Sequence, residues 1–436
     1  MDLPAKGSAP ADVISRMKQM RAEDAKWKDG KTFSLVYHAS DEHSRLLKDA
    51  YTEFMSENGL SPVAFPSLRR FEAEVVAMAL GLFHGTPDAA GSMTSGGTES
   101  VMMAVKVARD WARKEKGIKE PHLIFPETVH PAFGKAAHYF DLECEYAPVG
   151  SDFRVSVAEV EKRLRPQTAL IVGSAMPYPH GVVDDIEALA RLAKSRGILC
   201  HVDACLGGFI LPFAKKLGRP IPNFDFAVDG VTSISADLHK YGFAAKGASL
   251  VLYRSHALRK HQFYTYGGWS GGLYASPTMT GTRPGGAIAA AWAALNYYGE
   301  EGYLRQAKLI LETSDALQRG IAKIPGLRVL GEPHGPVFAF ASDKLNVYEL
   351  GDAMNARGWK LDRQMKPPAL HLMITPAHAP VMGLFLSDLE ACASALAKGE
   401  PAPDGSAAMY GMVGQMPDQS SIDAFLVEFL DGLYEL

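Results

Sequence analysis

The chain contains the run Ile198-Leu199-Cys200-His201-Val202-Asp203, which is apolar for most of its length and ends in a carboxylate. A short run without polar alternation, preceded by a helical pattern, is typical of a strand buried on both faces of a sheet. We therefore expect a strand over Ile198–Ala204, with Asp203 at its carboxyl end. Buried strands of this kind belong to α/β folds.

The same alternation extends toward the N-terminus. Two further apolar strands are expected at His122–Phe125 and Thr168–Gly173, each followed by a helix, at Ala132–Phe140 and Asp185–Arg196. Strands that alternate with helices predict a mainly parallel sheet covered by helices on both faces. Ligands of such sheets bind at the carboxyl ends of the strands. His130 and Ser174 follow strands in this series, as Asp203 does.

Toward the C-terminus, three more strands are expected at Phe224–Val228, Val231–Ile234 and Ala248–Tyr253. Glycine-rich stretches follow at Tyr266–Gly272 and Gly281–Gly286. So many glycines argue against regular structure and favour a backbone that passes close to a ligand or a neighbouring subunit. A helix is expected over Ala287–Tyr298.

The domain prediction has three parts: an N-terminal arm with helices over residues 1–60, a large domain over 61–303 and a smaller α+β domain over 304–436. The arm is expected to contain helices at Ala11–Trp27 and Asp41–Asn58. The small domain combines short strands with helices, and the last helix is expected over Ser421–Leu433.

Composition excludes several classes of protein. The 436 residues are 47% hydrophobic with a formal net charge of −4, so neither a nucleic-acid footprint nor a polybasic membrane patch is indicated. Four cysteines without CxxC spacing predict neither a disulfide framework nor a metal site. We expect no apolar run to approach the ~20 residues that are needed to span a bilayer. We expect a soluble, cytoplasmic protein.

The stretch Ser233-Ile234-Ser235-Ala236-Asp237-Leu238-His239-Lys240-Tyr241-Gly242 places a lysine just before an apolar strand. Burying a lysine there costs free energy unless chemistry uses it. Pyridoxal phosphate (PLP) requires a lysine for a Schiff base, a carboxylate for its pyridinium nitrogen, an anion site and a flat group over its ring. Lys240, Asp203, the turn Gly96-Gly97-Thr98 and His130 supply one candidate for each.

Each of these residues also has a plainer explanation. Asp203 could cap a helix, Lys240 could lie on the surface, and His130 could be a hydrogen-bonded core histidine. The glycine turn could be a simple loop before a helix capped by Thr98. Their joint occurrence in this order favours the PLP hypothesis.

Longer motifs carry a family resemblance. The strings His201–Phe209, Ser233–Tyr241 and Tyr274–Thr278 closely resemble the sphingosine-1-phosphate lyase family. That family belongs to the fold-type I PLP-dependent enzymes, near the group II amino acid decarboxylases. The resemblance covers nearly the whole chain, and it includes Met176–Gly181 and Met409–Met412.

The resemblance implies a homodimer with active sites at the subunit interface. By position, Lys240 matches the Schiff-base lysine, Asp203 the pyridinium partner and His130 the stacking histidine. The remaining cofactor contacts that it implies are Gly97, Thr98, Ser174, His201, Ser235 and His239, with Gly271, Gly272 and Thr282 donated by the other subunit. Tyr37, Lys246 and Tyr410 correspond to residues near the substrate.

The implied reaction is a retro-aldol cleavage of the C2–C3 bond of a phosphorylated sphingoid base, which gives a long-chain aldehyde and phosphoethanolamine. Lys240, Lys246, Tyr37 and His130 form the expected catalytic set. The base at the C3 hydroxyl is open between Lys246 and Lys240, with Tyr37 as a relay, and Lys246 alternatively binds the substrate phosphate. No nucleic acid and at most peripheral membrane contact are expected.

Two other functions compete with this one. An amino acid decarboxylase would share Lys240, Asp203 and His130, but Cys205-Leu206 and Lys246 favour the lyase. A catalytically silent binding protein on the same fold would be expected to lack the lysine or the aspartate, and both are present.

The sequence also departs from the family pattern at four positions. Ser61 and Val63 stand in a segment where relatives often carry His-Pro-Asp, and Phe243 and Ala245 replace a tyrosine and a proline. We expect these changes to border the pocket and to affect substrate preference more than cofactor binding.

Overall fold

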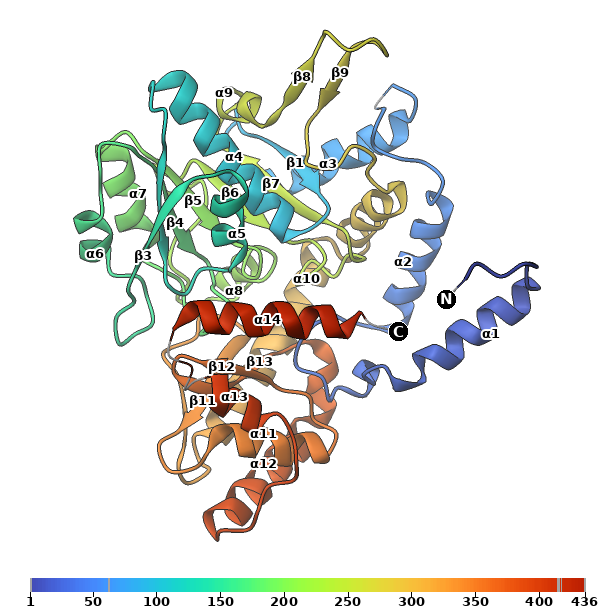
Figure 1. Cartoon of the computed structure of the whole chain (residues 1–436), viewed down its shortest axis with the longest axis vertical. Coiled ribbons are helices and arrows are strands. Elements are labelled where there is room, and N and C mark those ends of the chain that lie inside the picture. Colours follow the sequence, from blue (N-terminus) through green and yellow to red (C-terminus); the bar gives the residue numbers. More distant parts are fainter. Residues whose placement is uncertain (1, 62, 414–415, 417, 435–436) are drawn as a thin grey trace.

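The computed structural model describes residues 2–61, 63–413, 416 and 418–434. A seven-stranded sheet forms the centre of the large domain, in the order β1-β7-β6-β5-β4-β2-β3 (Figure 1). Its strands are β1 (Ala90–Thr94), β2 (His122–Pro126), β3 (Glu143–Ala147), β4 (Thr168–Ser174), β5 (Leu199–Asp203), β6 (Ser233–Ala236) and β7 (Ser249–Tyr253).

The sheet is mainly parallel, as predicted. Strands β3, β2, β4, β5 and β6 pair in parallel, whereas β7 runs antiparallel to both of its neighbours, β6 and β1. Every residue of β4 and β5 is buried, which explains why these strands read as continuous apolar runs. The α/β fold class expected from the sequence is therefore confirmed.

Helices cover both faces of this sheet. They are α4 (Gly97–Glu115), α5 (Ala132–Tyr139), α6 (Val157–Lys162), α7 (Ile186–Ser195), α8 (Leu211–Lys216) and the short α9 (His256–Arg259). Helix α4 buries Val101, Val105 and Ala108 in one cluster with Leu170 and Val172 of β4. This packing fixes the first turn of α4 near the carboxyl ends of the central strands.

A single long helix, α10 (Gly285–Ile321), leads from the large to the small domain. The predicted helix ends at Tyr298, and the structure instead continues through Gly299, which has φ 51° and ψ −172° and marks a kink. Glycine adopts positive φ without steric cost, so the element can bend there without ending. The predicted domain boundary at residues 303 and 304 falls inside this helix.

The small domain contains a four-stranded antiparallel sheet in the order β10-β11-β13-β12. Its elements are β10 (Leu327–Val329), β11 (Val337–Ser342), α11 (Val347–Ala356), β12 (Asp362–Met365), β13 (Pro368–Met373), α12 (Met382–Ala397) and α13 (Ala407–Val413). The predicted combination of short strands and helices is thus present.

The strand predicted at Phe224–Val228 is wrong. The chain turns here, and the guanidinium of Arg254 donates hydrogen bonds to the carbonyls of Phe226 at 3.0 Å and Val228 at 2.7 Å. A side chain satisfies backbone acceptors that a neighbouring strand would otherwise satisfy. Strands β1 and β3 were not predicted.

The glycine-rich stretch has more regular structure than expected. Strands β8 (Tyr264–Tyr266) and β9 (Tyr274–Ser276) pair as an antiparallel hairpin with the glycines at its tip. The hairpin projects from the top of the large domain (Figure 1). Its exposed apolar side chains include Tyr264, Trp269 and Leu273.

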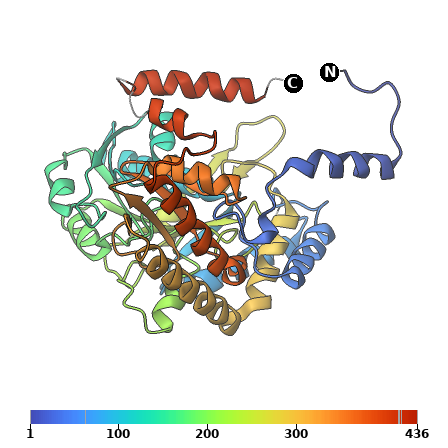
Figure 2. The same ribbon diagram turned by 90° about the horizontal axis from the view of Figure 1, so that it is seen from below.

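Both ends of the chain form helices on the outside of the molecule. The N-terminal region has α1 (Pro10–Met20), α2 (Asp41–Glu53) and α3 (Pro66–Leu82), and the C-terminal region ends in α14 (Gln419–Leu433). The observed helix α1 ends at Met20 and is therefore shorter than the helix predicted over Ala11–Trp27. Helix α14 stands apart from the body, on the side where the chain begins (Figure 2).

One helical stretch corrects the expectation about apolar runs. Residues Pro376–Ala397 are long and apolar enough to cross a membrane, with mean hydropathy 1.3, although only 22% of that stretch is buried. Phe385 and Leu389 pack into the core. Asp388 accepts hydrogen bonds from Trp359 Nε1 at 2.9 Å and from Arg357 Nη1 at 2.7 Å. These contacts fit an outer helix of the small domain.

Candidate active site

The carboxyl ends of three neighbouring strands meet at one edge of the sheet. Ser174 of β4 is in register with Asp203 of β5, and Asp203 with Ser235 of β6. Asp203 Oδ1 accepts the backbone N–H of Cys205 at 3.0 Å and the Ser235 hydroxyl at 3.3 Å. The hydroxyl of Ser174 is buried without a hydrogen-bond partner among the described residues. The site thus combines an oriented carboxylate with an unused polar group.

His201 lies behind Asp203, deeper in the sheet. Its Nδ1 is 2.8 Å from Ser233 Oγ and its Nε2 is 3.1 Å from Ser235 Oγ. Burial lowers the pKa of His201 to about 4, so the ring is neutral. Because both nitrogens are engaged by serines, His201 supports Asp203 through Ser235, and the structure gives it no direct path to the cleft.

Lys240 follows β6 and pairs with Asp237, which the sequence analysis did not assign to the site. Lys240 Nζ is 2.9 Å from Asp237 Oδ2, and the Asp237 side chain is 1% exposed. Burial alone would lower the pKa of Lys240, but the charge of Asp237 outweighs it and raises that pKa. Burial likewise opposes ionisation of Asp237, yet Lys240 and His239 hold its pKa well below the usual range. The sequence signal that could have identified Asp237 as a site residue is its position three residues before Lys240.

His239 is held in one orientation beside this ion pair. Its Nδ1 accepts the backbone N–H of Ala248 at 3.1 Å, and its Nε2 lies 3.6 Å from Asp237 Oδ2. An Nδ1 that accepts requires the proton of the neutral ring to be on Nε2. His239 therefore presents an N–H toward Asp237.

The predicted anion-binding turn opens α4. Gly96 is the N-cap residue without a side-chain cap, so the alternative of a helix capped by Thr98 does not apply. A Cβ at Gly97 would lie 2.8 Å from Asp237 Oδ2 and 3.1 Å from Cys205 Sγ. Glycine here keeps the turn open, and the free N–H groups of a helix start suit a phosphate. Thr98 is exposed beside it.

His130 lies after β2 with an exposed ring, and its Nδ1 accepts the backbone N–H of Ala132 at 3.1 Å. The pKa of His130 is lowered by desolvation, while the nearby charge of Asp203 opposes that shift. A neutral ring with an open face, close to Asp203 and Lys240, is suited to stacking on a flat cofactor.

Tyr37 and Lys246 are also brought to Lys240. The Tyr37 hydroxyl donates to Met373 Sδ at 3.3 Å, its ring meets Tyr241 edge-on at 5.0 Å, and Lys246 Nζ lies 5.2 Å from the centre of the Tyr37 ring. Burial raises the pKa of Tyr37, whereas burial and the charge of Lys240 lower the pKa of Lys246. A protonated phenol thus lies beside an amine that loses its proton more easily than usual.

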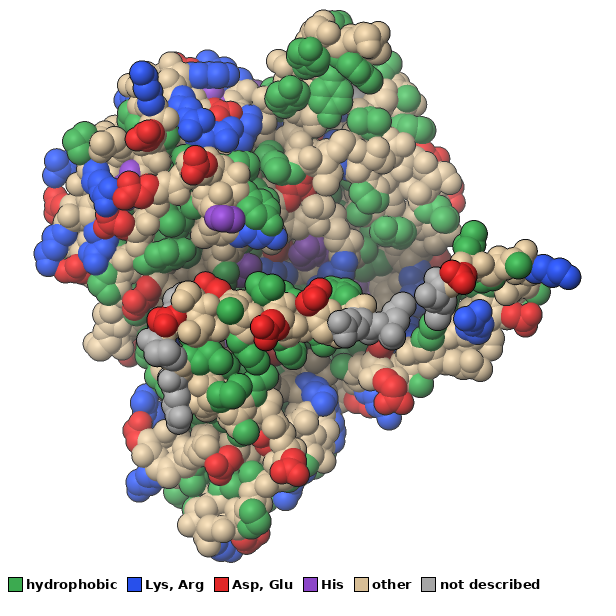
Figure 3. Space-filling model, viewed as in Figure 1, with side chains coloured by type: hydrophobic (Ala, Val, Ile, Leu, Met, Phe, Trp, Pro, Cys, Tyr) green, Lys and Arg blue, Asp and Glu red, His purple; other side chains and the backbone are tan. Residues whose placement is uncertain are grey.

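Asp362 and Tyr410 of the small domain lie near Tyr178 of the large domain. Tyr178, which the sequence analysis did not assign, donates its hydroxyl to Asp362 Oδ2 at 2.6 Å, and burial followed by the charge of Asp362 raises its pKa. Tyr410 packs against Tyr348 with ring centres 5.3 Å apart and lies 5.8 Å from Arg363 Cζ. Figure 3 shows histidine and basic side chains gathered in the hollow between the large domain and α14.

Gly271, Gly272 and Thr282 are placed differently. The two glycines form the tip of the projecting hairpin, and Thr282 lies on the exposed segment before α10. The part of this segment at Met279 is tied to the first turn of α4, because Glu99 Oε1 accepts the Met279 N–H at 2.8 Å. The hairpin tip points away from the body of its own chain (Figure 1).

The four departures from the family pattern have different surroundings. Phe243 is 2% exposed and packs against Tyr298 with ring centres 5.7 Å apart. Val63 is 85% exposed. That these changes border the pocket stays a prediction.

These residues fit PLP. The buried, unpartnered Ser174 hydroxyl and the oriented Asp203 lie at the carboxyl ends of neighbouring strands, and the open turn at Gly97 and the ammonium of Lys240 both lie against Asp237. Lys240 would hold the carbonyl carbon of the cofactor and Asp203 its ring nitrogen, with Gly97 and Thr98 at its phosphate. The fold and the site together define a PLP-dependent enzyme.

Comparison with known proteins identifies the family. The family model described as the pyridoxal-dependent decarboxylase conserved domain matches residues 4–342. A sphingosine-1-phosphate lyase of Arabidopsis thaliana is 46% identical over 99% of this chain and 81% of its own length. The solved structure of a sphingosine-1-phosphate lyase from Burkholderia pseudomallei has a TM-score of 0.92 at 37% identity, covering 100% of this chain and 97% of that one. The chain belongs to the sphingosine-1-phosphate lyase family.

A more distant neighbour shows how widely the fold is shared. A glutamate decarboxylase from Lactobacillus brevis has a TM-score of 0.78 at 20% identity, with 91% of this chain and 96% of that chain covered. At this identity the likeness shows the fold alone.

Proposed function

We propose that this chain cleaves the C2–C3 bond of a phosphorylated long-chain base to give a long-chain aldehyde and phosphoethanolamine. The main observation in support of this proposal is that Lys246 and Tyr37 lie beside Lys240, with Lys246 Nζ 5.2 Å from the centre of the Tyr37 ring. Near full-length similarity to sphingosine-1-phosphate lyases supports the same reaction.

PLP, when bound, supplies an electron sink for the carbanion that forms at C2. The protein must hold the ring nitrogen protonated, and the carboxylate of Asp203 is oriented for this by Cys205 and Ser235. His201 hydrogen-bonds to Ser235, and Ser235 hydrogen-bonds to Asp203. These two hydrogen bonds hold the Asp203 carboxylate in place for the ring nitrogen of the cofactor.

A base must remove the proton of the C3 hydroxyl. Lys246 suits this role because burial and the charge of Lys240 lower the pKa of its amine. Lys240 is less suited in the ion-paired state, since Asp237 raises its pKa. Tyr37 stays protonated, because burial raises the pKa of the phenol, and it can relay a proton by accepting one as it donates its own. We propose Lys246 as the base and Tyr37 as the relay.

The alternative is an amino acid decarboxylase. It would use Lys240, Asp203 and His130 in the same way, and it would need no amine of lowered pKa beside Tyr37. Lys246, at that position, favours carbon–carbon cleavage over loss of carbon dioxide.

The test uses the holoenzyme. Purified protein is incubated with phosphorylated sphinganine, and long-chain aldehyde is measured by mass spectrometry, with amino acids and carbon dioxide release as the second arm. We expect aldehyde from wild type and none from Lys240→Ala. Carbon dioxide without aldehyde would establish the alternative, and undiminished aldehyde from Lys240→Ala would refute the assigned site.

We further propose that the enzyme works as a homodimer. The projecting hairpin, with Gly271 and Gly272 at its tip and exposed Trp269 and Leu273 beside them, is shaped to reach a neighbouring subunit. A complementation experiment tests this. Lys240→Ala and a variant with the tip Gly267–Gly272 removed are inactive alone, and mixed dimers are expected to regain activity. No recovery after verified subunit exchange would contradict a shared site.

The proposed location is the cytoplasm, with the amphiphilic substrate taken from solution or from a membrane surface. The cysteines Cys144, Cys200, Cys205 and Cys392 are all free thiols, which suits a reducing compartment. Fractionation of cells that express the chain tests this: the protein is expected in the soluble fraction, and a salt-resistant membrane fraction would contradict it.

A further inference from the structure

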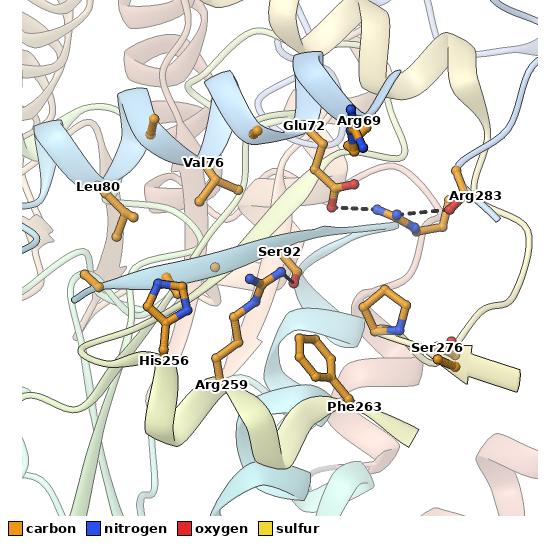
Figure 4. Close-up of a pocket in the computed structure, with 18 of the residues that line it drawn as sticks. Arg69, Glu72, Val76, Leu80, Ser92, His256, Arg259, Phe263, Ser276 and Arg283 are labelled. Atoms are coloured by element: carbon orange, nitrogen blue, oxygen red, sulfur yellow. Dashed lines mark hydrogen bonds and ion pairs between the residues drawn. The ribbon is translucent and has the colours of Figure 1, made fainter. Parts of the chain in front are cut away.

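Two arginine–carboxylate ion pairs of the described residues contain an arginine side chain that is at most 12% exposed. One of them, Arg283 with Glu72, joins the segment before α10 to α3 within the large domain (Figure 4). The other, Arg363 with Asp352, lies in the small domain, and the Asp352 side chain is only 4% exposed. Burying such a pair costs desolvation free energy, which further hydrogen bonds to the two groups must offset. The hydrogen bonds of Asp352 therefore show what this pair holds.

Asp352 accepts two backbone N–H groups of the C-terminal segment. Its Oδ1 accepts the Ser406 N–H at 3.0 Å, and its Oδ2 accepts the Ala407 N–H at 2.8 Å. These N–H groups open α13, where no earlier carbonyl of the helix can accept them. A carboxylate of α11 thus caps the start of α13, and Arg363 of β12 donates to the same carboxylate through Nη2.

Two glycines allow these groups to approach so closely. A Cβ at Gly405 would overlap the carboxylate of Asp352, so the segment before α13 reaches Asp352 only without a side chain at this position. A Cβ at Gly351 would lie 3.1 Å from Arg363 Nη2. The absence of a side chain at Gly351 therefore leaves room for the guanidinium beside α11.

Helix α13 places Tyr410 beside the same arginine. The centre of the Tyr410 ring lies 5.8 Å from Arg363 Cζ and 5.3 Å from the ring centre of Tyr348. Burial and the charge of Asp362 raise the pKa of Tyr178, and the nearby phenol of Tyr410 adds to this shift. The Tyr410 ring is thus held by the small domain and lies near Tyr178.

We propose that Asp352, held by Arg363, is a positioning residue that fixes the start of α13 and so orients the Tyr410 hydroxyl toward the substrate. The inference rests on the proposed cleavage reaction, in which Tyr410 lies near the substrate. Helix α13 has only seven residues, and so short a helix is unstable by itself in water. The anchor at Ser406 and Ala407 therefore decides where the Tyr410 ring lies.

A double-mutant cycle in the holoenzyme tests the proposal. The kcat/KM for phosphorylated sphinganine is measured for Asp352→Ala, Tyr410→Phe and the double variant. Each single change should lower kcat/KM roughly tenfold or more, and the double variant should lie within about threefold of Tyr410→Phe, because Asp352 acts through Tyr410. Additive losses would overturn the proposal, since a purely structural role of Asp352 predicts them. A wild-type kcat/KM in Tyr410→Phe would overturn it as well.

Hydrogen exchange checks the anchor independently of activity. In the holoenzyme, the amides of residues 405–413 should exchange roughly tenfold faster in Asp352→Ala than in wild type, because the start of α13 loses its acceptors. Gly405→Ala keeps both partners of the ion pair and displaces only the segment that contacts Asp352. It should accelerate exchange as Asp352→Ala does, and its loss of kcat/KM should also be non-additive with Tyr410→Phe.

Asp388→Ala is the matched control. Asp388 is also a carboxylate of the small domain that pairs with an arginine, but its partners are Arg357 and Trp359. Exchange over residues 405–413 should be unchanged in Asp388→Ala, and any loss of kcat/KM should add to that of Tyr410→Phe. Wild-type exchange in both Asp352→Ala and Gly405→Ala would overturn the proposal. The absence of aldehyde from wild type would refute the proposed function instead, and the exchange rates would still decide whether Asp352 anchors α13.

Discussion

At the scale of single residues, the ion pair between Lys240 and Asp237 sets the charge of the reactive lysine. The 2.9 Å contact stabilises the ammonium form, whereas attack on the cofactor's carbonyl requires the free amine. Cofactor binding must therefore release the lysine from Asp237. Asp237 thus favours the protonated form of Lys240.

The first prediction concerns Asp237→Asn. Without the carboxylate charge, burial should dominate and lower the pKa of Lys240. A fall of one unit would raise the rate of Lys240 labelling by an amine-reactive reagent roughly tenfold in the apoenzyme at neutral pH. Mass spectrometry of the Lys240 peptide gives the rate. Asp225→Asn, which removes a mostly buried carboxylate paired with His84, is the control, and equal rates in wild type and Asp237→Asn would contradict the argument.

The second prediction separates the two roles of Lys246. An arginine at this position keeps the positive charge for a phosphate but stays protonated near neutral pH. If Lys246 is the base, Lys246→Arg should lower kcat by a factor of ~100 or more with little change in KM, while Lys246→Met should affect both. Steady-state kinetics with phosphorylated sphinganine measures this. Near wild-type kcat in Lys246→Arg would assign Lys246 to phosphate binding.

At the scale of elements, the first turn of α4 couples the sheet to the cofactor site. Gly97 brings the helix start against Asp237 and Cys205. Glu99 accepts the Ser95 N–H at 2.6 Å and the Met279 N–H at 2.8 Å, so the turn is fixed from both sides. A rigid turn can orient a phosphate without further ordering on binding.

The third prediction uses two glycines. Gly97→Ala would place a methyl group 2.8 Å from Asp237 Oδ2, and it should weaken cofactor retention at least tenfold while the fold persists. Gly81→Ala on α3 has no atom within 4 Å of the new methyl group, and it should raise stability by ~1 kcal/mol through helix propensity. Cofactor absorbance after dialysis and thermal unfolding measure the two effects. Equal cofactor retention in both variants would contradict the tight-turn argument.

At the scale of the whole molecule, buried histidines make the fold sensitive to acid. Burial lowers the pKa to about 4 for five of them, His43, His180, His201, His371 and His378. Each is neutral in the folded chain and takes up a proton more readily when the chain unfolds. Their contribution is complete above the unfolded pKa of about 6.5 and is lost as the pH falls from there toward 4.

The fourth prediction follows from this linkage. Stability should fall as the pH drops from 7 to 5.5, by about 1.4 kcal/mol for each such histidine at one unit below its unfolded pKa. Urea unfolding across this range measures the slope. His180→Phe removes one of these titratable groups and keeps an aromatic ring to stack on Phe153, whose ring centre lies 3.9 Å from that of His180. The free energy of unfolding should then fall less steeply with pH. An unchanged slope would assign the acid sensitivity to other groups.

Much of the fold could be predicted from the sequence, because apolar periodicity directly reports burial. The strands at β2, β4, β5 and β7 and the helices at α5 and α7 follow such patterns. The edge strands β1 and β3 do not follow such patterns, because β1 consists mostly of small residues, including a glycine, and β3 contains several polar residues. The helix predicted to end at Tyr298 continues through a kink at Gly299, and residues of α10 on both sides of this kink pack into the core.

The sequence by itself determined the strands β2, β4, β5 and β7, the order of Asp203 and Lys240, and the family, because these are properties of local pattern and of aligned motifs. Tertiary structure alone decided which groups meet. Tyr37 reaches Met373 across 336 residues, Tyr178 reaches Asp362 across 184, and Asp237 turns inward to hold Lys240. Such contacts depend on how elements pack, and burial then sets the pKa values on which the chemistry relies.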